Sequence, residues 1–122
     1  MVIAMIVGLA AGIALGLIFN IAYPLEYSFY ITIGLLAAMD SVVGALRSYL
    51  EGKYNNIIFI TGFLTNAVLA GILTFVGDKL GVPLYYAAIL VFGGRLFNNL
   101  AASRRIAIDN HIAKKNKAAG EK

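Results

Sequence analysis

The chain has 122 residues, of which 61% are hydrophobic and 13% are charged, and its mean hydropathy is +0.84. A soluble domain contains about 25% charged residues, and so short a chain cannot bury this many apolar side chains in water. We therefore expect an integral membrane protein. The absence of cysteine excludes disulfides, thiol redox chemistry and thiolate metal sites.

The net charge of +4 comes entirely from the C-terminal part of the chain. Basic and acidic residues balance through Ser103, whereas from Arg104 onward six basic residues accompany two acidic ones. A basic segment can bind nucleic acid, but one that directly follows an apolar segment is typical of a cytoplasmic topology anchor. We therefore expect a basic cytoplasmic tail over 104–122 and no nucleic-acid partner.

Four apolar segments follow one another along the chain. They cover residues 1–25, 27–49, 54–77 and 84–103, and only the last is interrupted near its middle by a basic residue, Arg95. Each segment has close to the roughly 20 residues that a helix needs to cross about 30 Å of hydrocarbon. The pattern predicts an all-α membrane protein with four transmembrane helices joined by short loops.

This interpretation assigns residues 1–103 to a four-helix transmembrane domain. The alternative for the first segment is a signal peptide, but no basic region precedes it and no polar mature domain follows it. Basic residues favour the cytoplasmic side of a membrane. The link that holds Arg47 and Lys53 and the basic tail should therefore both be cytoplasmic, and with four spans both termini are cytoplasmic.

Small residues recur at every fourth position in three of the segments. In the first segment Gly8, Gly12 and Gly16 follow Ala4, and such a face lets another helix backbone approach closely. The approaching helix can belong to the same chain or to a second copy, and a bundle with so little interior favours a homo-oligomer. The second and third segments carry similar stripes, at Ala37, Ser41, Gly44 and Ser48 and at Gly62, Asn66 and Ala70.

Two charged residues lie on one face of the second segment. Asp40 and Arg47 are seven residues apart with Gly44 between them, which is about 10 Å along a helix. A direct pair at that separation is marginal. Arg47 lies near the predicted cytoplasmic edge, where a long side chain extends to the interface, so Asp40 needs another partner.

The fourth segment offers that partner, because it runs in the same direction as the second. Asp40 follows Pro24 by sixteen residues and Arg95 follows Pro83 by twelve, so Arg95 lies about 6 Å closer to the outer face. An isolated charge at the bilayer centre costs about 2.5–3.5 kcal/mol even on insertion scales. We predict an intramembrane Asp40–Arg95 pair, with three candidate hydrogen-bonding partners: Asn66, Asn98 and Asn99.

The role of this pair stays open at this point. It can fix the register of two helices, form a ligand or ion site, or contact the helix of a partner protein. The remaining polar residues are less informative: His111 stands alone in the tail, and the tyrosines near the outer links are typical of an interfacial belt. No nucleophile–base pair, phosphate-binding loop or metal-spaced acidic set is present in the sequence, so we expect no catalytic residues, no metal and no cofactor.

Four runs of sequence resemble the bacterial small basic protein family. They are "PLEYSFYITIGLLAAMDSVVGALRS" (24–48), "EGKY" (51–54), "FITGFLTN" (59–66) and "FGGRLFNNLA" (92–101). The resemblance implies a multi-pass protein of the plasma membrane with no known activity, often encoded beside cell-division genes. The family-type positions it marks are Glu26, Tyr27, Asp40, Gly44, Arg47, Asn66, Arg95 and Asn98. Pro83 departs from the aspartate that the family pattern has there.

Together these observations predict a non-enzymatic membrane protein of unknown activity. It would act by self-association and by interaction with envelope or cell-division membrane proteins, while its tail contacts anionic lipid or a cytosolic partner. The alternative is a small transporter, a channel or a binder of lipid-linked ligands that uses Asp40 and Arg95.

Overall fold

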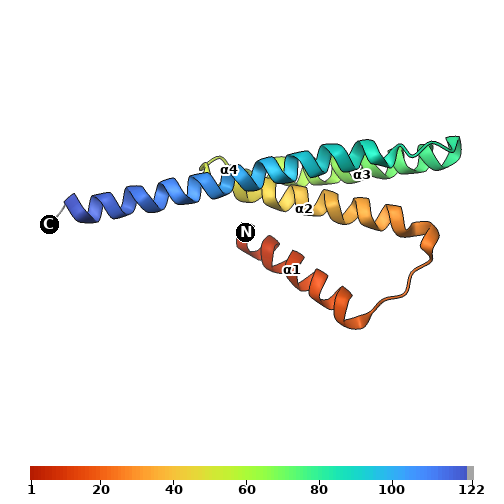
Figure 1. The fold of residues 1–122 in the computed structure, drawn as a ribbon, viewed down its shortest axis with the longest axis horizontal. Coiled ribbons are helices and arrows are strands. Elements are labelled where there is room, and N and C mark those ends of the chain that lie inside the picture. Colours follow the sequence, from red (N-terminus) through yellow and green to blue (C-terminus); the bar gives the residue numbers. More distant parts are fainter. Residues whose placement is uncertain (121–122) are drawn as a thin grey trace.

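The computed structural model describes residues 1–120, and within them every regular element is helical (Figure 1). The elements are α1 (Val2–Phe19), the short 3-10 helix η1 (Leu25–Tyr27), α2 (Ser28–Leu50), α3 (Asn56–Leu80) and α4 (Tyr85–Gly120). The all-α prediction is confirmed. Glu121 and Lys122, the end of the predicted tail, lie outside the described residues.

Helix α2 is the centre of the bundle. It contacts α1, α3 and α4, and it runs antiparallel to α3 and in the same direction as α4 (Figure 1). The core between α2, α3 and α4 is built from Ile33, Ala37, Ala70, Ala88 and Phe92. Alanine at three of these five positions lets the helix backbones approach closely, which brings the polar side chains of α2 and α4 within reach of each other.

Helix α1 stands apart from this three-helix core. Among the helices it contacts only α2, and it diverges from α2 toward the connection that joins them (Figure 1). That connection begins at Asn20, whose φ of 43° and ψ of 52° place it in the left-handed conformation that often ends a helix. Val2 is the one buried residue of α1, so the helix leaves nearly all its apolar surface uncovered within the chain.

Local contacts fix both ends of α3, and the connection from its end to α4 is tight. Asn55 caps the start of α3 by accepting hydrogen bonds from the backbone amides of Ile57 and Ile58 at 2.9 and 3.1 Å. At the other end, a Cβ on Gly77 would lie 2.5 Å from the carbonyl oxygen of Val82. The chain therefore folds back against the last turn of α3, and this sets where α4 begins.

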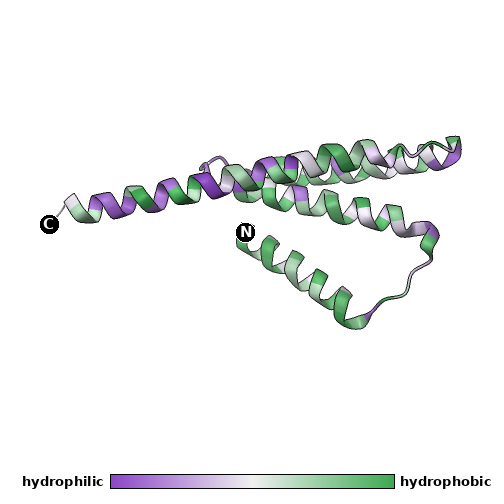
Figure 2. Ribbon diagram, viewed as in Figure 1, coloured by the Kyte–Doolittle hydropathy of each residue, from purple (hydrophilic) through white to green (hydrophobic). Residues whose placement is uncertain are grey.

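Three segments are long and apolar enough to cross a membrane: α1, α2 together with η1, and α3. Helix α4 is not one of them, although the sequence pattern predicts four spans. The physical reason is its composition, since Arg95, Asn98 and Asn99 lower the hydropathy of the part of α4 beside the bundle. Figure 2 shows this difference as purple turns in α4 against the almost uniformly apolar α1.

The predicted boundary after Ser103 does not coincide with a break in secondary structure. Helix α4 has 36 residues and continues without interruption past the end of the bundle (Figure 1). Ser103 is still buried, whereas almost every residue from Arg104 to Gly120 is exposed. The basic segment is thus the projecting half of one long helix.

Candidate functional site

Asp40 and Arg95 form an ion pair between α2 and α4. The Nη2 atom of Arg95 lies 3.3 Å from Oδ2 of Asp40. Asp40 is fully buried because it sits on the face of the central helix that packs against α4, while half of the Arg95 side chain is exposed. Neither carboxylate oxygen accepts a hydrogen bond, so electrostatic attraction to one guanidinium is what compensates this buried charge.

A second charged cluster lies at the end of α2. The Nε atom of Arg47 donates to Oε1 of Glu51 at 2.8 Å, and its Nη1 donates to Oδ1 of Asn99 at 3.2 Å. The hydrogen bond from Arg47 lowers the pKa of Glu51 below its ordinary value. The sequence reasoning about Arg47 overlooked Glu51, although the four-residue spacing of the two on one helix is a known signal for an ion pair.

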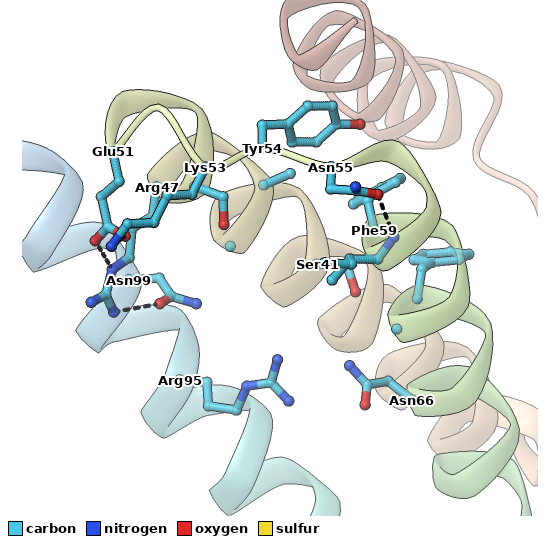
Figure 3. Close-up of a pocket in the computed structure, with 16 residues that line it drawn as sticks. Ser41, Arg47, Glu51, Lys53, Tyr54, Asn55, Phe59, Asn66, Arg95 and Asn99 are labelled. Atoms are coloured by element: carbon cyan, nitrogen blue, oxygen red, sulfur yellow. Dashed lines mark hydrogen bonds and ion pairs between the residues drawn. The ribbon is translucent and has the colours of Figure 1, made fainter.

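These two clusters border a polar cavity of about 400 Å³ between α2, α3 and α4 (Figure 3). Its charged lining residues are three basic side chains, Arg47, Lys53 and Arg95, and one acidic side chain, Glu51. Neutral polar lining residues are Ser41, Ser48, Tyr54, Asn55, Asn66 and Asn99. The cavity is therefore both polar and positively charged, at the end of the bundle where α2 ends and α3 begins.

The three asparagines predicted to hydrogen-bond the ion pair have different positions. Asn66 lines the cavity and points toward Arg95 across it (Figure 3). Asn99 hydrogen-bonds Arg47 instead of the pair. Asn98 is exposed and does not line the cavity. None of them donates to Asp40, whose oxygens have no hydrogen bond.

The predicted packing residues fall into two groups. On α2, Ser41 is buried beside the cavity, and a Cβ on Gly44 would lie 3.4 Å from Nδ2 of Asn99, so a side chain larger than alanine there would meet α4. On α1, a Cβ on Gly8, Gly12 or Gly16 would have no atom within 4 Å. The α1 glycines therefore do not pack against another helix of the same chain.

A smaller polar contact closes the opposite end of the bundle. The hydroxyl of Tyr30 donates to Oδ2 of Asp78 at 2.9 Å, and the rings of Phe29 and Tyr85 stack with centroids 4.3 Å apart. These contacts tie α2 to both α3 and α4. Two of the tyrosines near the outer links, Tyr30 and Tyr85, therefore make contacts within the bundle.

The family model described as "Protein of unknown function (DUF1290)" matches residues 23–108, which include both charged clusters and the cavity. The chain is 45% identical over 95 residues to the "Small basic protein" of Bacillus subtilis, covering 77% of this chain and 78% of that protein. It is 44% identical over 78 residues to uncharacterized proteins of Mycobacterium bovis and Mycobacterium tuberculosis, covering 62% of this chain and 64% of theirs.

No solved structure matches this fold. The two lines of similarity agree with each other, since the family model covers well over half of the chain and the Bacillus subtilis relative is aligned over most of its own length. The chain therefore belongs to the bacterial small basic protein family, whose members have no assigned biochemical function.

Proposed function

We propose that this protein spans the bacterial plasma membrane several times and acts by association, first with a second copy of itself, rather than by catalysis. The observation that carries the proposal is the uncovered glycine face of α1. Gly8, Gly12 and Gly16 lie on a helix without charges, and among the described residues no atom outside the local helix backbone comes within 4 Å of the Cβ positions they lack. In a bilayer such a face favours close packing against another helix.

The exposed polar surface of α4 supports the same proposal. Asn98 is exposed and does not line the cavity, on a helix that packs beside the membrane-length helix α2. Polar groups that face lipid are unfavourable. A neighbouring protein that covers this side of α4 would remove them from lipid.

The proposal includes four spans, with both termini on the cytoplasmic side. Residues 85–103 of α4 provide about 28 Å of helix, close to the thickness of the hydrocarbon core. The start of α1 and the basic half of α4 lie at the same end of the bundle (Figure 1). Basic residues favour the cytoplasmic side, and there the tail would meet anionic lipid or a cytosolic partner.

Cysteine cross-linking tests the association, because the natural chain contains no cysteine. Gly12→Cys places a thiol on the glycine face, and Ala14→Cys places one on the opposite side of the same helix. In native membranes treated with a mild oxidant, Gly12→Cys should form a disulfide-linked dimer and Ala14→Cys should not. Equal cross-linking of both variants, or of neither, contradicts a specific α1 interface.

Thiol labelling tests the topology separately. Ala22→Cys lies in the connection between α1 and η1, and Ala118→Cys lies in the projecting half of α4. A membrane-impermeant maleimide added to intact cells should label the first variant and spare the second until the cells are permeabilised. Labelling of Ala118→Cys in intact cells contradicts the proposed orientation.

The proposed partners beyond a second copy are envelope or cell-division membrane proteins. Affinity purification from native membranes at natural abundance, followed by mass spectrometry, should recover such a protein with wild type. Recovery should fall with Gly12→Leu and stay unchanged with Ala14→Leu. Equal recovery with wild type, Gly12→Leu and Ala14→Leu would show that the partner does not bind through the glycine face of α1.

A second candidate function is ligand binding or transport, and the polar cavity favours it. Arg95 reaches from its buried partner Asp40 to the cavity wall with half of its side chain still accessible. A pair that only fixed helix register would not need to present a guanidinium to an open space. The chemistry of the lining residues indicates which ligand fits.

A further inference from the structure

The cavity has two unlike walls. Arg47 on α2 and both Arg95 and Asn99 on α4 form a wall of hydrogen-bond donors and acceptors (Figure 3). Residues Ile58, Phe59 and Phe63 of α3 form an apolar wall, in which the two phenylalanine rings have centroids 6.2 Å apart. A ligand that contacts both walls is therefore amphipathic, with a polar head and an apolar chain.

The charges of the lining favour an anionic head. Three basic side chains and one acidic side chain line the cavity, and one positive charge remains in excess even when the buried Asp40 behind Arg95 is included. An anion bound here would contact Arg47 and Arg95, which line the same cavity and are partly shielded from solvent. Elsewhere before residue 104 the chain carries one basic residue, Lys79, against two acidic ones, Glu26 and Asp78, so the positive excess is confined to the cavity.

The two arginines are held in place and still have unused donors. Arg47 is oriented by Glu51 and Asn99, and Arg95 is oriented by Asp40. A guanidinium carries five N–H donors in a planar fork, and these partners occupy only some of them. Such a fork matches the geometry of phosphate oxygens, and Asn66 adds a further amide on the facing wall.

The position of the cavity indicates that its ligand comes from the bilayer. Ile58 lines the cavity and is itself 69% exposed, so the apolar wall continues into the outer surface of α3. Arg47 and Lys53 lie at the end of α2 and in the following link, at interfacial depth, whereas Arg95 lies about 13 Å deeper than Arg104 along α4. A lipid can thus enter sideways, with its head near the interface.

We infer that this cavity binds the phosphate group of an anionic phospholipid from the cytoplasmic leaflet. Arg47 and Arg95 hold the phosphate oxygens, and Ile58, Phe59 and Phe63 contact the acyl chain. Asp40 is a positioning residue, which directs the Arg95 guanidinium without touching the lipid. The inference rests on the proposed placement of α2, α3 and α4 in one bilayer, and it is independent of self-association through α1.

Native mass spectrometry of the full-length protein tests this site. The protein is reconstituted in nanodiscs of equimolar phosphatidylglycerol and phosphatidylcholine, released, and examined for bound lipid. Wild type should retain about one phosphatidylglycerol per chain in preference to phosphatidylcholine. Arg47→Gln should reduce its retention by about tenfold, a typical effect of losing a hydrogen bond between charged groups. Lys79→Gln, which removes the same charge from an exposed position at the opposite end of the bundle, should leave it unchanged.

Two further variants guard against misfolding. Arg95→Gln leaves the buried Asp40 without its cation, so the double variant Asp40→Asn/Arg95→Gln is measured instead, and it should lose the bound lipid while remaining monodisperse. Gly62→Leu fills the cavity without changing any charge, since Gly62 lines it and a Cβ there meets no atom within 4 Å. Gly71→Leu is the control, on the same helix and equally unobstructed but away from the cavity. Lipid retention should fall only for Gly62→Leu.

Three results would overturn the inference. One is equal retention of the two lipids by wild type, and another is an equal loss for Arg47→Gln and Lys79→Gln. The third is displacement of the lipid by millimolar inorganic phosphate, which would identify a soluble anion as the ligand. Thiol labelling of Ala22→Cys and Ala118→Cys reports on membrane placement independently, so a failed lipid site is distinguishable from a wrong topology.

Discussion

Asp40 is fully buried, whereas Arg95, whose Nη2 atom lies 3.3 Å from Asp40 Oδ2, exposes half of its side chain. The two partners of this ion pair therefore depend on each other unequally. Arg95 has access to the cavity and to other polar groups if its partner is removed. Asp40 has no other partner among the residues that the structure describes, because neither of its oxygens accepts a hydrogen bond there.

The first prediction follows from this asymmetry. Arg95→Gln should cost more stability than Asp40→Asn, because it leaves a buried carboxylate uncompensated, a change that costs up to about 3–5 kcal/mol. The double variant should recover most of that loss, since it contains no buried charge. The measurement is the temperature at which half of the monodisperse protein is lost in detergent. Equal single costs that simply add in the double variant would show that the two residues are not coupled.

The second prediction concerns the approach of α4 to α2 at Gly44. A leucine there would push against Asn99, whose Nδ2 lies 3.4 Å from the position of a Cβ, and would separate the two helices at the edge of the cavity. Gly44→Leu should lower the detergent midpoint by several degrees, corresponding to about 1–3 kcal/mol of overpacking. Gly34→Leu is the matched control on the same helix, because a Cβ there meets no atom within 4 Å. A similar midpoint for both variants would contradict the close contact.

The third prediction concerns the turn between α3 and α4. Gly77→Ala places a methyl group 2.5 Å from the carbonyl oxygen of Val82, so the link must move and the variant should be destabilised by about 1–3 kcal/mol. Gly71→Ala, elsewhere on α3 in open space, should be neutral or stabilising by up to about 1 kcal/mol, since alanine favours helix. Detergent midpoints of the two variants check this, and a stabilised Gly77→Ala would show that the turn is not constrained there.

The fourth prediction is a dependence on pH. The hydrogen bond from Arg47 lowers the pKa of Glu51 in the folded protein from an ordinary value of 4.5. A carboxyl whose folded pKa is lowered contributes stability above its unfolded pKa and loses that contribution as the pH falls through the folded pKa. Detergent midpoints measured from pH 6.5 downward should therefore fall for wild type below about pH 5, by a small amount because Glu51 is exposed at the end of α2. Glu51→Gln should show a flatter profile, and identical profiles would refute this role.

Arg95 was predictable as the partner of Asp40 because two prolines serve as reference points for depth in the membrane. Pro24 and Pro83 stand shortly before α2 and α4, two helices that run in the same direction, so residue counts from each proline compare directly. Their alignment brought Arg95 near Asp40 without any other information. The same depth argument could not choose among the asparagines, because hydrogen bonding depends on side-chain direction, and Asn98 lies on an exposed face of α4.

Two features could not be predicted from the sequence pattern: what packs against α1, and the conformation of the segment after Ser103. An apolar helix such as α1 carries small residues toward any neighbour, so its sequence cannot distinguish a partner within the chain from one outside it. The segment after Ser103 has helix-forming residues and no proline, yet whether it continues a helix or unfolds depends on its neighbours and on the interface. The Arg47–Glu51 pair, by contrast, has the four-residue spacing of an ion pair on one helix and was predictable from the sequence.

Helix α4 contains both Arg95, which pairs with the buried Asp40, and the basic residues that follow Ser103. The two regions are therefore joined by one uninterrupted helix. Helix α4 continues for about 38 Å from Arg95 to Gly120, so a tilt of about 10° where Arg95 meets Asp40 would move its far end by about 7 Å. A ligand in the cavity beside Arg95 would contact α4 close to this point of tilt, far from the end of the helix. In the proposed membrane placement, a small shift beside Arg95 would therefore become a larger displacement of the basic residues at the far end of α4.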